Sequence, residues 1–195
     1  MLHPITTRDT SAYWSDLFNN EELDQILNLC KTLPLETGTI GNYETTVDDI
    51  RKSSVGWLTR NEDTEWIFSR YDGAVQRSNS CWFGLDLDPL RMIQFTVYDD
   101  AGGHYEWHWD MHTTPEADNT DVIKQRKLSV VTQLNAPDEY DGGVFQVAPC
   151  GQLYDIERKK GLTYMFLSFV NHRVSPVTKG TRYSLVGWYE GPDWR

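Results

Sequence analysis

Hydrophobic residues recur at helical spacing twice in the first half of the chain. A first helix is expected to begin near Asn19 and to stop before Pro34, with apolar positions at Leu23, Ile26, Leu27 and Cys30. A second stripe at offsets of 0, 1, 4, 5, 8 and 9 consists of Trp66, Ile67, Arg70, Tyr71, Ala74 and Val75. Such stripes are typical of helices that pack one face on a core.

From residue 91 onward the hydrophobic period changes to two. Segments rich in β-branched and aromatic residues, bounded by Gly, Pro, Asn or Asp, are expected to be strands: 91–98, 128–135, 144–147, 162–170 and 183–189. Strands after helices favour an α+β fold, a jelly roll (double-stranded β-helix) with the N-terminal helices packed on its major sheet. We expect one domain over residues 1–195, with 1–90 as helical support and 91–190 as the jelly-roll core. Residues 111–126 are polar and are interpreted as a surface loop and a mobile lid.

Composition narrows the classes of function. The formal net charge of −11 and the pI near 4.8 argue against nucleic acid as a partner, because phosphate neutralisation needs clustered Lys and Arg. The three cysteines show no metal-binding spacing and are expected to be reduced thiols. The N-terminal residues lack an apolar stretch and no segment reaches the length of a membrane span, so we expect a soluble, cytoplasmic protein.

The pair His108 and Asp110 is the first candidate for chemistry. Residues two apart on an extended strand point to the same face, where both side chains can serve as adjacent metal ligands. Trp107 and Trp109 then point to the opposite face, where burial against the outer sheet is favoured over stacking on a substrate ring. The pair alone is weak evidence for a metal site, because most histidines are only exposed or hydrogen-bonded.

Two later residues complete an informative order of ligands. His172 follows the segment 162–170, and Arg182 opens the last segment, where it shares a face with Ser184, Val186 and Trp188. His-x-Asp followed by a distant His is the order of a 2-His-1-carboxylate iron(II) site, which leaves coordination positions open. An inward arginine needs an anion, and the far carboxylate of 2-oxoglutarate fits its planar fork. A structural salt bridge is the alternative role for Arg182.

Other residues join or compete with this set. Tyr98 shares a polar face with Gln94 and Thr96, so its hydroxyl can meet the cofactor. His112 has the spacing of a helical zinc pair with His108, and His104 lies in a Gly-rich turn; neither is favoured as a ligand. A non-catalytic ligand-binding jelly roll and a zinc or nickel cupin-like enzyme are the rival classes.

Residues 91–189 resemble the prolyl-4-hydroxylase-like Fe(II)/2-oxoglutarate dioxygenases, particularly their bacterial and phage members. The run from Tyr98 through Tyr105 to His108-Trp-Asp110 is similar to the family's Tyr, aromatic and His-x-Asp block. The run 126–135 with the later Gly142-Gly143 resembles the family's central strand and hairpin, and residues 160–188 resemble its closing segment.

The resemblance implies a role for each matching residue. His108, Asp110 and His172 would bind Fe(II), and Arg182 would hold the far carboxylate of 2-oxoglutarate. Three more residues would contact the cofactor: Tyr98 through its hydroxyl, Gln133 through an amide where some relatives carry Tyr, and Trp188 as a lining aromatic. Tyr105 would be an aromatic at the pocket mouth, where substrate enters.

The resemblance also implies the reaction. It is hydroxylation with O2 as co-substrate and with release of succinate and CO2; ascorbate is compatible with it as an additional reductant. The expected substrate is a prolyl residue of a peptide or protein, hydroxylated as by a prolyl 4-hydroxylase, and the alternative is a free amino acid or another small molecule. Asp110 favours hydroxylation, because related halogenases replace this carboxylate. Arg182, where animal and plant prolyl 4-hydroxylases carry a nearby Lys, weakens any inference to collagen-like substrates.

Overall fold

The computed structural model describes residues 10–40, 48–111, 116–118 and 122–194. Its larger sheet has nine strands, and the main order is β1 (Ser11–Trp14), β12 (Thr163–Leu167), β8 (Val122–Gln133), β14 (Val177–Pro192), β5 (Met92–Asp99), β4 (Ser54–Thr59) and β2 (Glu36–Thr37). Beside this path, β7 (Glu116–Asp118) pairs with β8, and β9 (Tyr140–Gly142) pairs with β14.

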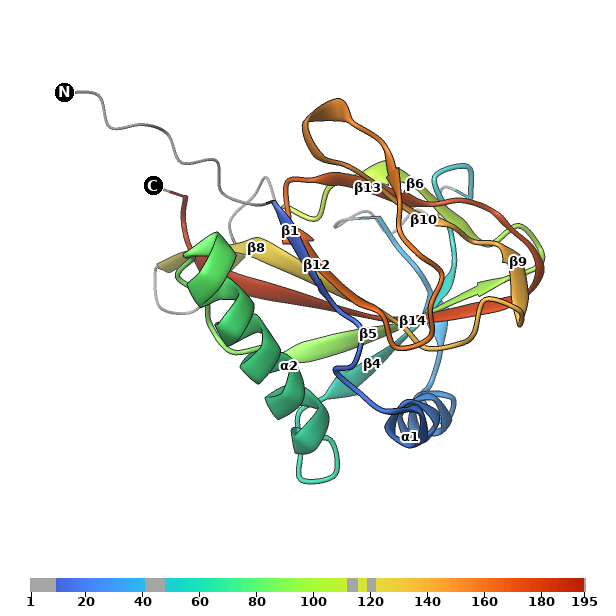
Figure 1. The fold of residues 1–195 in the computed structure, drawn as a ribbon, viewed down its shortest axis with the longest axis horizontal. Coiled ribbons are helices and arrows are strands. Elements are labelled where there is room, and N and C mark those ends of the chain that lie inside the picture. The colour runs from blue at the N-terminus through green and yellow to red at the C-terminus, as the bar shows by residue number, and fades with distance from the viewer. Residues whose placement is uncertain (1–9, 41–47, 112–115, 119–121, 195) are drawn as a thin grey trace.

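The smaller sheet has five strands, in the order β11 (Tyr154–Asp155), β10 (Phe145–Ala148), β13 (Asn171–Val174), β6 (His104–His108) and β3 (Arg51–Lys52). The strand pairs of both sheets are antiparallel, and the two sheets face each other (Figure 1). This is the jelly roll that the alternating pattern predicts. A second core fills the space between the sheets, with Val131, Phe145, Phe166 and Val174 among its members.

Helices α1 (Asn20–Cys30) and α2 (Glu65–Ser78) pack on the outer face of the larger sheet, as predicted (Figure 1). Their buried faces share one cluster with strand residues, including Ile26 and Tyr71 from the helices and Ile93, Leu128 and Leu185 from the sheet. A π-helical turn (Asn79–Phe83) extends α2, and a short 3-10 turn (Pro149–Gly151) follows β10. Burial of this apolar stripe, rather than helix propensity, is the main stabilisation of both helices.

The start of α1 follows from its sequence. The side chain of Asn19 accepts a hydrogen bond from the backbone N–H of Glu22, and the Glu22 carboxylate accepts one from the backbone N–H of Asn19, both at 2.9 Å. This reciprocal capping box satisfies two backbone donors that the helix itself leaves unpaired. The helix ends at Cys30, ahead of Pro34.

Several strand boundaries differ from the prediction. The segment 162–170 is shorter as a strand, because β12 ends at Leu167 and a turn follows, with the N–H of Val170 donating to the carbonyl of Leu167. His172 therefore lies inside a separate strand, β13, and Arg182 lies within the 16-residue β14 rather than at its start. Residues before 91 also contribute strands: β1, β2 and β4 extend the larger sheet, and β3 extends the smaller one.

The loop predicted for residues 111–126 is partly wrong. β7 and the first residues of β8 lie in it, whereas residues 112–115 and 119–121 fall outside the described part of the chain. Residues 124–126 pair with the end of β14, where Glu190 lies opposite Arg126 and Pro192 opposite Lys124. A partner more than sixty residues away imposes this extended conformation, so local polarity could not reveal it.

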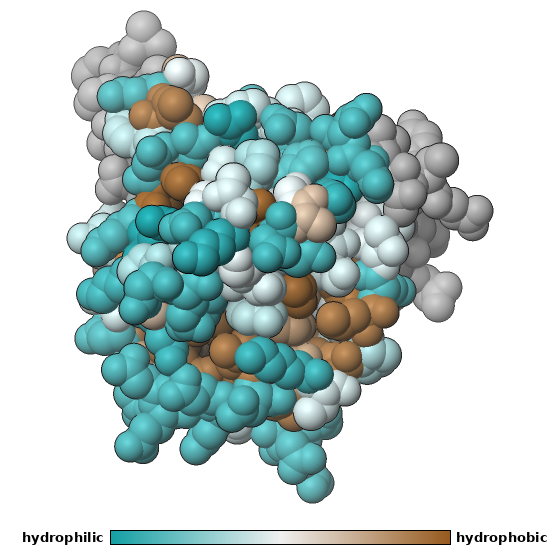
Figure 2. Space-filling model, turned by 90° about the vertical axis from the view of Figure 1, so that its right-hand side faces the viewer, coloured by the Kyte–Doolittle hydropathy of each residue, from teal (hydrophilic) through white to brown (hydrophobic). Residues whose placement is uncertain are grey.

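The burial predicted for Trp107 and Trp109 is also wrong, since their exposed fractions are 39% and 54%. The helices cover only the larger sheet, which leaves the outer face of β6 open to solvent (Figure 1). Trp107 is instead covered in part by the guanidinium of Arg173, 5.0 Å from its ring centroid. Figure 2 shows one face of the molecule, on which hydrophilic side chains predominate and hydrophobic ones gather in the lower half. No helix among the described residues is long and apolar enough to cross a membrane.

Candidate metal centre and cofactor pocket

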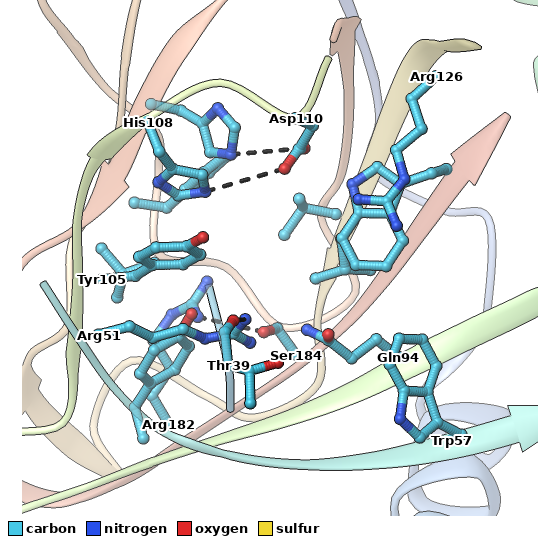
Figure 3. Close-up of a pocket in the computed structure, with 17 residues that line it drawn as sticks. Thr39, Arg51, Trp57, Gln94, Tyr105, His108, Asp110, Arg126, Arg182 and Ser184 are labelled. Carbon is cyan, nitrogen blue, oxygen red and sulfur yellow. Dashed lines mark hydrogen bonds and ion pairs between the residues drawn. The ribbon is translucent and has the colours of Figure 1, made fainter. Parts of the chain in front are cut away.

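Three potential metal ligands meet on the inner face of the smaller sheet. His108 of β6 lies directly opposite His172 of β13, and Asp110 follows β6 by two residues. The His108 Nε2 lies 3.8 Å from Asp110 Oδ1, and the His172 Nε2 lies 3.5 Å from Asp110 Oδ2 (Figure 3). The structure therefore brings together the three predicted ligands, with ligand atoms within 4.8 Å of one another.

The hydrogen bonds of both imidazoles orient them as ligands. The Nδ1 of His108 lies 2.7 Å from the carbonyl of Glu106, and that of His172 lies 3.0 Å from the carbonyl of Val170. A carbonyl only accepts, so each Nδ1 carries the proton and each Nε2 presents its lone pair. Burial, with His172 nearby, lowers the pKa of His108 to about 3 and keeps it neutral. Two lone pairs facing a carboxylate repel one another, and a divalent cation removes that repulsion; the donor set thus fits Fe(II).

Asp110 is fixed from the larger sheet. The hydroxyl of Ser129 on β8 donates to Asp110 Oδ2 at 2.7 Å, and the backbone N–H of Asp110 donates to the carbonyl of Ser168 at 2.9 Å. Burial alone would raise the pKa of Asp110, but His172, His108 and the Ser129 hydroxyl together bring this pKa below its usual value. Asp110 is therefore ionised and held in place as a ligand.

A cavity of about 230 Å³ extends from these ligands along the larger sheet. Its wall follows from the strand register: Arg182 lies opposite Tyr98, and Val186 lies opposite Gln94 on β5 and Val131 on β8. Side chains of paired residues stand on the same face, so these rows line the cavity together with Ser184 and Trp188. The predicted shared face of Arg182, Ser184, Val186 and Trp188 is confirmed.

Arg182 lies at the other end of the cavity from Asp110 (Figure 3). It is only 1% exposed, and its NH1 donates to the Ser184 hydroxyl at 3.2 Å. Its Nε and NH2 are buried and have no hydrogen-bond partner in the described structure. A buried guanidinium with two open donors is costly to leave unpaired. One carboxylate would satisfy both donors, so the site fits the far carboxylate of 2-oxoglutarate.

The remaining predicted residues separate into two groups. Tyr98, Tyr105 and Trp188 line the cavity, and burial raises the pKa of Tyr98, so its hydroxyl keeps the proton. Gln133 does not line it: the amide donates to the carbonyl of Glu157 at 2.6 Å and accepts from the Tyr140 hydroxyl at 3.3 Å. The structure thus gives Gln133 a role in packing and does not place it against the cofactor cavity.

Two β-bulges explain why strict alternation missed part of the lining. On β6, His108 pairs with His172 but Tyr105 pairs with Val174, so one extra residue lets Tyr105 share the face of His108. The two rings stack with centroids 3.5 Å apart. On β8, Tyr189 pairs with Leu128 and Glu190 with Arg126, so Lys127 is bulged and Arg126 lines the cavity.

Other lining residues come from the part of the chain that was expected to be helical support. Thr39, Arg51 and Trp57 precede residue 91 and carry no pattern that marks them as site residues. The run Ser54–Thr59 contains Val55, Trp57 and Thr59, residue types enriched in strands, and this is a signal that could have identified β4, and with it Trp57. Among the competing histidines, His104 binds the carbonyl of Gly102 away from the metal ligands, and His112 is outside the described residues.

Comparisons with known proteins agree with this geometry. The family model described as the 2OG-Fe(II) oxygenase superfamily matches residues 93–190. A PKHD-type hydroxylase of Azoarcus sp. (strain BH72) is 32% identical over 114 residues, which cover 56% of this chain and 48% of that protein. A PKHD-type hydroxylase of Synechococcus sp. (strain JA-2-3B'a(2-13)) is 27% identical over 177 residues, covering 90% of this chain and 75% of that protein. The chain thus spans about half of the first relative and three quarters of the second.

Solved structures show the same fold. A Pseudomonas putida prolyl-4-hydroxylase superposes with a TM-score of 0.71 at 21% identity, over 94% of each chain. A prolyl hydroxylase from Trichoplax adhaerens, in complex with a peptide fragment of the hypoxia inducible factor oxygen degradation domain, gives a TM-score of 0.73 at 21% identity, over 92% of this chain and 83% of that one.

Proposed function

The chain belongs to the 2OG-Fe(II) oxygenase superfamily, whose model matches about half of it, and we propose that it is a hydroxylase dependent on Fe(II), 2-oxoglutarate and O2. One observation carries the proposal: His108, Asp110 and His172 share a single cavity with a buried Arg182 that has two unpaired donors. A purely ligand-binding jelly roll would need no such arginine at the far end of a metal site.

The residues that line the cavity have three roles: to bind the metal, to bind the cofactor and to exclude water. When bound, Fe(II) with 2-oxoglutarate and O2 supplies the oxidation of a substrate C–H group to C–OH, with succinate and CO2 as products. His108, Asp110 and His172 would hold the metal, and the cavity extends from these three ligands. Arg182 would anchor the far carboxylate, and the protonated hydroxyl of Tyr98, which lies opposite Arg182 on β5, would be a further donor in the cavity. The apolar side chains of Val131 and Val186 line this part of the cavity and disfavour water there.

We propose a prolyl residue of a peptide or protein as the substrate. The support is the fold shared with prolyl hydroxylases, of which the Trichoplax adhaerens structure contains a peptide fragment. A free amino acid or another small molecule is the alternative. Succinate release with proline-containing peptides, compared with free amino acids, decides between them: stimulation by free amino acids alone would contradict a prolyl peptide substrate.

Anaerobic addition of Fe(II) and then 2-oxoglutarate tests the oxygenase proposal directly. We expect a visible metal-to-ligand charge-transfer band in the wild type and none in His172→Ala. Arg182→Ala should need about tenfold to a hundredfold more 2-oxoglutarate for the same band, because it loses charge-assisted hydrogen bonds. Arg77→Gln is the matched control, since Arg77 stacks on Trp14 outside the cavity and its loss should leave the titration unchanged. No band in the wild type would overturn the proposal.

A further inference from the structure

The residues that line the cavity carry more positive than negative charge. Arg51, Arg126 and Arg182 line it, and Asp110 is the one carboxylate among its described lining residues. Asp110 belongs to the metal centre, where a divalent ion outweighs its charge. A cavity whose described lining carries more cationic than anionic side chains favours anionic ligands.

Arg51 is the cation whose surroundings are most informative. It is 8% exposed, its Nε donates to the Ser53 hydroxyl at 2.9 Å, and its NH1 donates to the carbonyl of Thr39 at 2.8 Å. Its guanidinium also lies 4.6 Å from the ring centroid of Tyr105. All of these partners are neutral, and no carboxylate of the described residues forms an ion pair with Arg51.

Arg51 and the proposed cofactor anchor, Arg182, enter the cavity from different sheets. Arg51 belongs to β3 of the smaller sheet, whereas Arg182 belongs to β14 of the larger sheet. Tyr105 lies between Arg51 and the metal ligand His108, on which its ring stacks (Figure 3). Arg51 therefore reaches the Arg182 end of the cavity from the opposite sheet, with Tyr105 between it and the metal ligand (Figure 3).

A charge balance follows if the proposed function holds. The metal centre would take one carboxylate of 2-oxoglutarate, and the two buried donors of Arg182 would take the other. Counting the divalent metal, Asp110, the dianionic cofactor and the three lining cations Arg51, Arg126 and Arg182 leaves a net charge of +2, and Arg51 forms no ion pair with a carboxylate of the described residues. We propose that the substrate carries a carboxylate and that Arg51 binds it, which makes Arg51 a specificity-determining residue of this site.

A substrate carboxylate has two sources, which the experiment separates. One is the α-carboxylate of a free amino acid, and the other is the side chain of an acidic residue next to the target residue in a peptide. Calorimetric titration of the Mn(II)- and 2-oxoglutarate-loaded protein uses two sets of probes. The first pairs each of the common free L-amino acids with its primary amide. The second pairs blocked proline peptides that carry Glu beside Pro with the same peptides carrying Gln.

We expect at least one carboxylate probe to bind, with its amide partner weaker by about tenfold or more, the effect of one lost charge-assisted contact. Arg51→Gln should bring the two members of that pair to about equal affinity without changing the 2-oxoglutarate titration of the charge-transfer band. Arg77→Gln, the matched control outside the cavity, should retain the full preference. If Arg51→Gln folds poorly, the difference in affinity between each carboxylate probe and its amide partner can still be measured on the wild type.

Two results would overturn the proposed role of Arg51. In both cases the presence of the charge-transfer band in the wild type would still support the proposed function. One is that neither set contains a probe whose binding depends on its carboxylate. The other is that Arg51→Gln weakens 2-oxoglutarate binding and keeps the acid preference, which would assign Arg51 to the cofactor. Absence of the band in the wild type would remove the proposed function first, and this inference with it.

Discussion

Serine hydroxyls support the charged groups at both ends of the pocket. Ser129 donates to the carboxylate of Asp110 at 2.7 Å, and Ser184 accepts from the guanidinium of Arg182 at 3.2 Å. A neutral partner orients a charged side chain without cancelling its charge. Asp110 therefore stays available to a metal ion and Arg182 to a carboxylate, which an internal salt bridge between charged partners would prevent.

Replacing Ser129 tests this support. Ser129→Ala should lower Fe(II) or Mn(II) affinity by roughly tenfold to a hundredfold, because Asp110 loses the hydrogen bond that fixes its Oδ2. Ser184→Ala is the crossed control: it should leave metal affinity unchanged and weaken 2-oxoglutarate binding instead. Equal metal affinity in Ser129→Ala and wild type, measured by calorimetry, would show that Asp110 needs no such support.

The three cysteines differ in their expected reactivity. Cys30 is fully buried and its pKa is raised to about 12 by burial, whereas Cys81 and Cys150 are exposed. The thiolate is the reactive form, so a thiol reagent at neutral pH should modify Cys81 and Cys150 in the native protein and reach Cys30 only on unfolding. Spectrophotometric thiol counting before and after denaturant checks this. Fast modification of Cys30 in the native state would mean that α1 opens readily.

At the scale of elements, the helices and the strands obey different constraints. Helix α1 depends on local signals, the capping box at Asn19 and Glu22 and the apolar stripe behind it. The inner strands depend on partners far along the chain, as with β14, which pairs with β5 on one side and β8 on the other. Local patterns therefore place helices well and leave strand ends and bulges to tertiary pairing.

Removal of the cap should destabilise the protein by a predictable amount. Asn19→Ala should lower the free energy of unfolding by about 1 kcal/mol, because the Glu22 N–H loses its acceptor. Asn28→Ala makes the same change in the exposed interior of α1, where Ala is the better helix former, and should not destabilise. Chemical denaturation of both variants checks the difference, and equal losses would show that the effect is not capping.

The Glu22 carboxylate gives this helix start a pH dependence. Its backbone hydrogen bond to Asn19 lowers its pKa, as does Arg70, so the folded pKa lies below the unfolded one. The stabilisation is therefore present above the unfolded pKa and is lost as pH falls through the folded pKa. The stability gap between wild type and Glu22→Gln should shrink on acidification; a gap that widens in acid would contradict this sign.

At the scale of the whole molecule, the candidate metal site joins the two sheets. His108 and His172 belong to the smaller sheet, whereas Ser129, which fixes Asp110, belongs to the larger one. The ring of Phe166 from β12 packs against His172 with centroids 4.7 Å apart. A residue of the core between the sheets is therefore in direct contact with a candidate metal ligand. Metal binding should therefore stabilise the packing of one sheet on the other.

Thermal unfolding with and without metal measures this coupling. Free Mn(II) at a hundred times its Kd should stabilise the wild type by about 2.7 kcal/mol, by mass action on the native state alone. His172→Ala should show almost none of this gain, and Arg77→Gln should show all of it. A metal-induced rise in Tm that His172→Ala retains would place the binding site elsewhere.

The sequence by itself determined the helices, the jelly-roll class and the order His108, Asp110, His172 and Arg182. Each of these rests on a local period or on spacing along the chain, which can be interpreted without knowledge of the fold. Only tertiary structure decided the rest of the pocket. The bulge that brings Arg126 inward, the hydrogen bonds that take Gln133 out of it, and the approach of Arg51 from β3 all depend on pairing with distant strands. Such pairing is cooperative over the whole sheet, so no local window of sequence contains it.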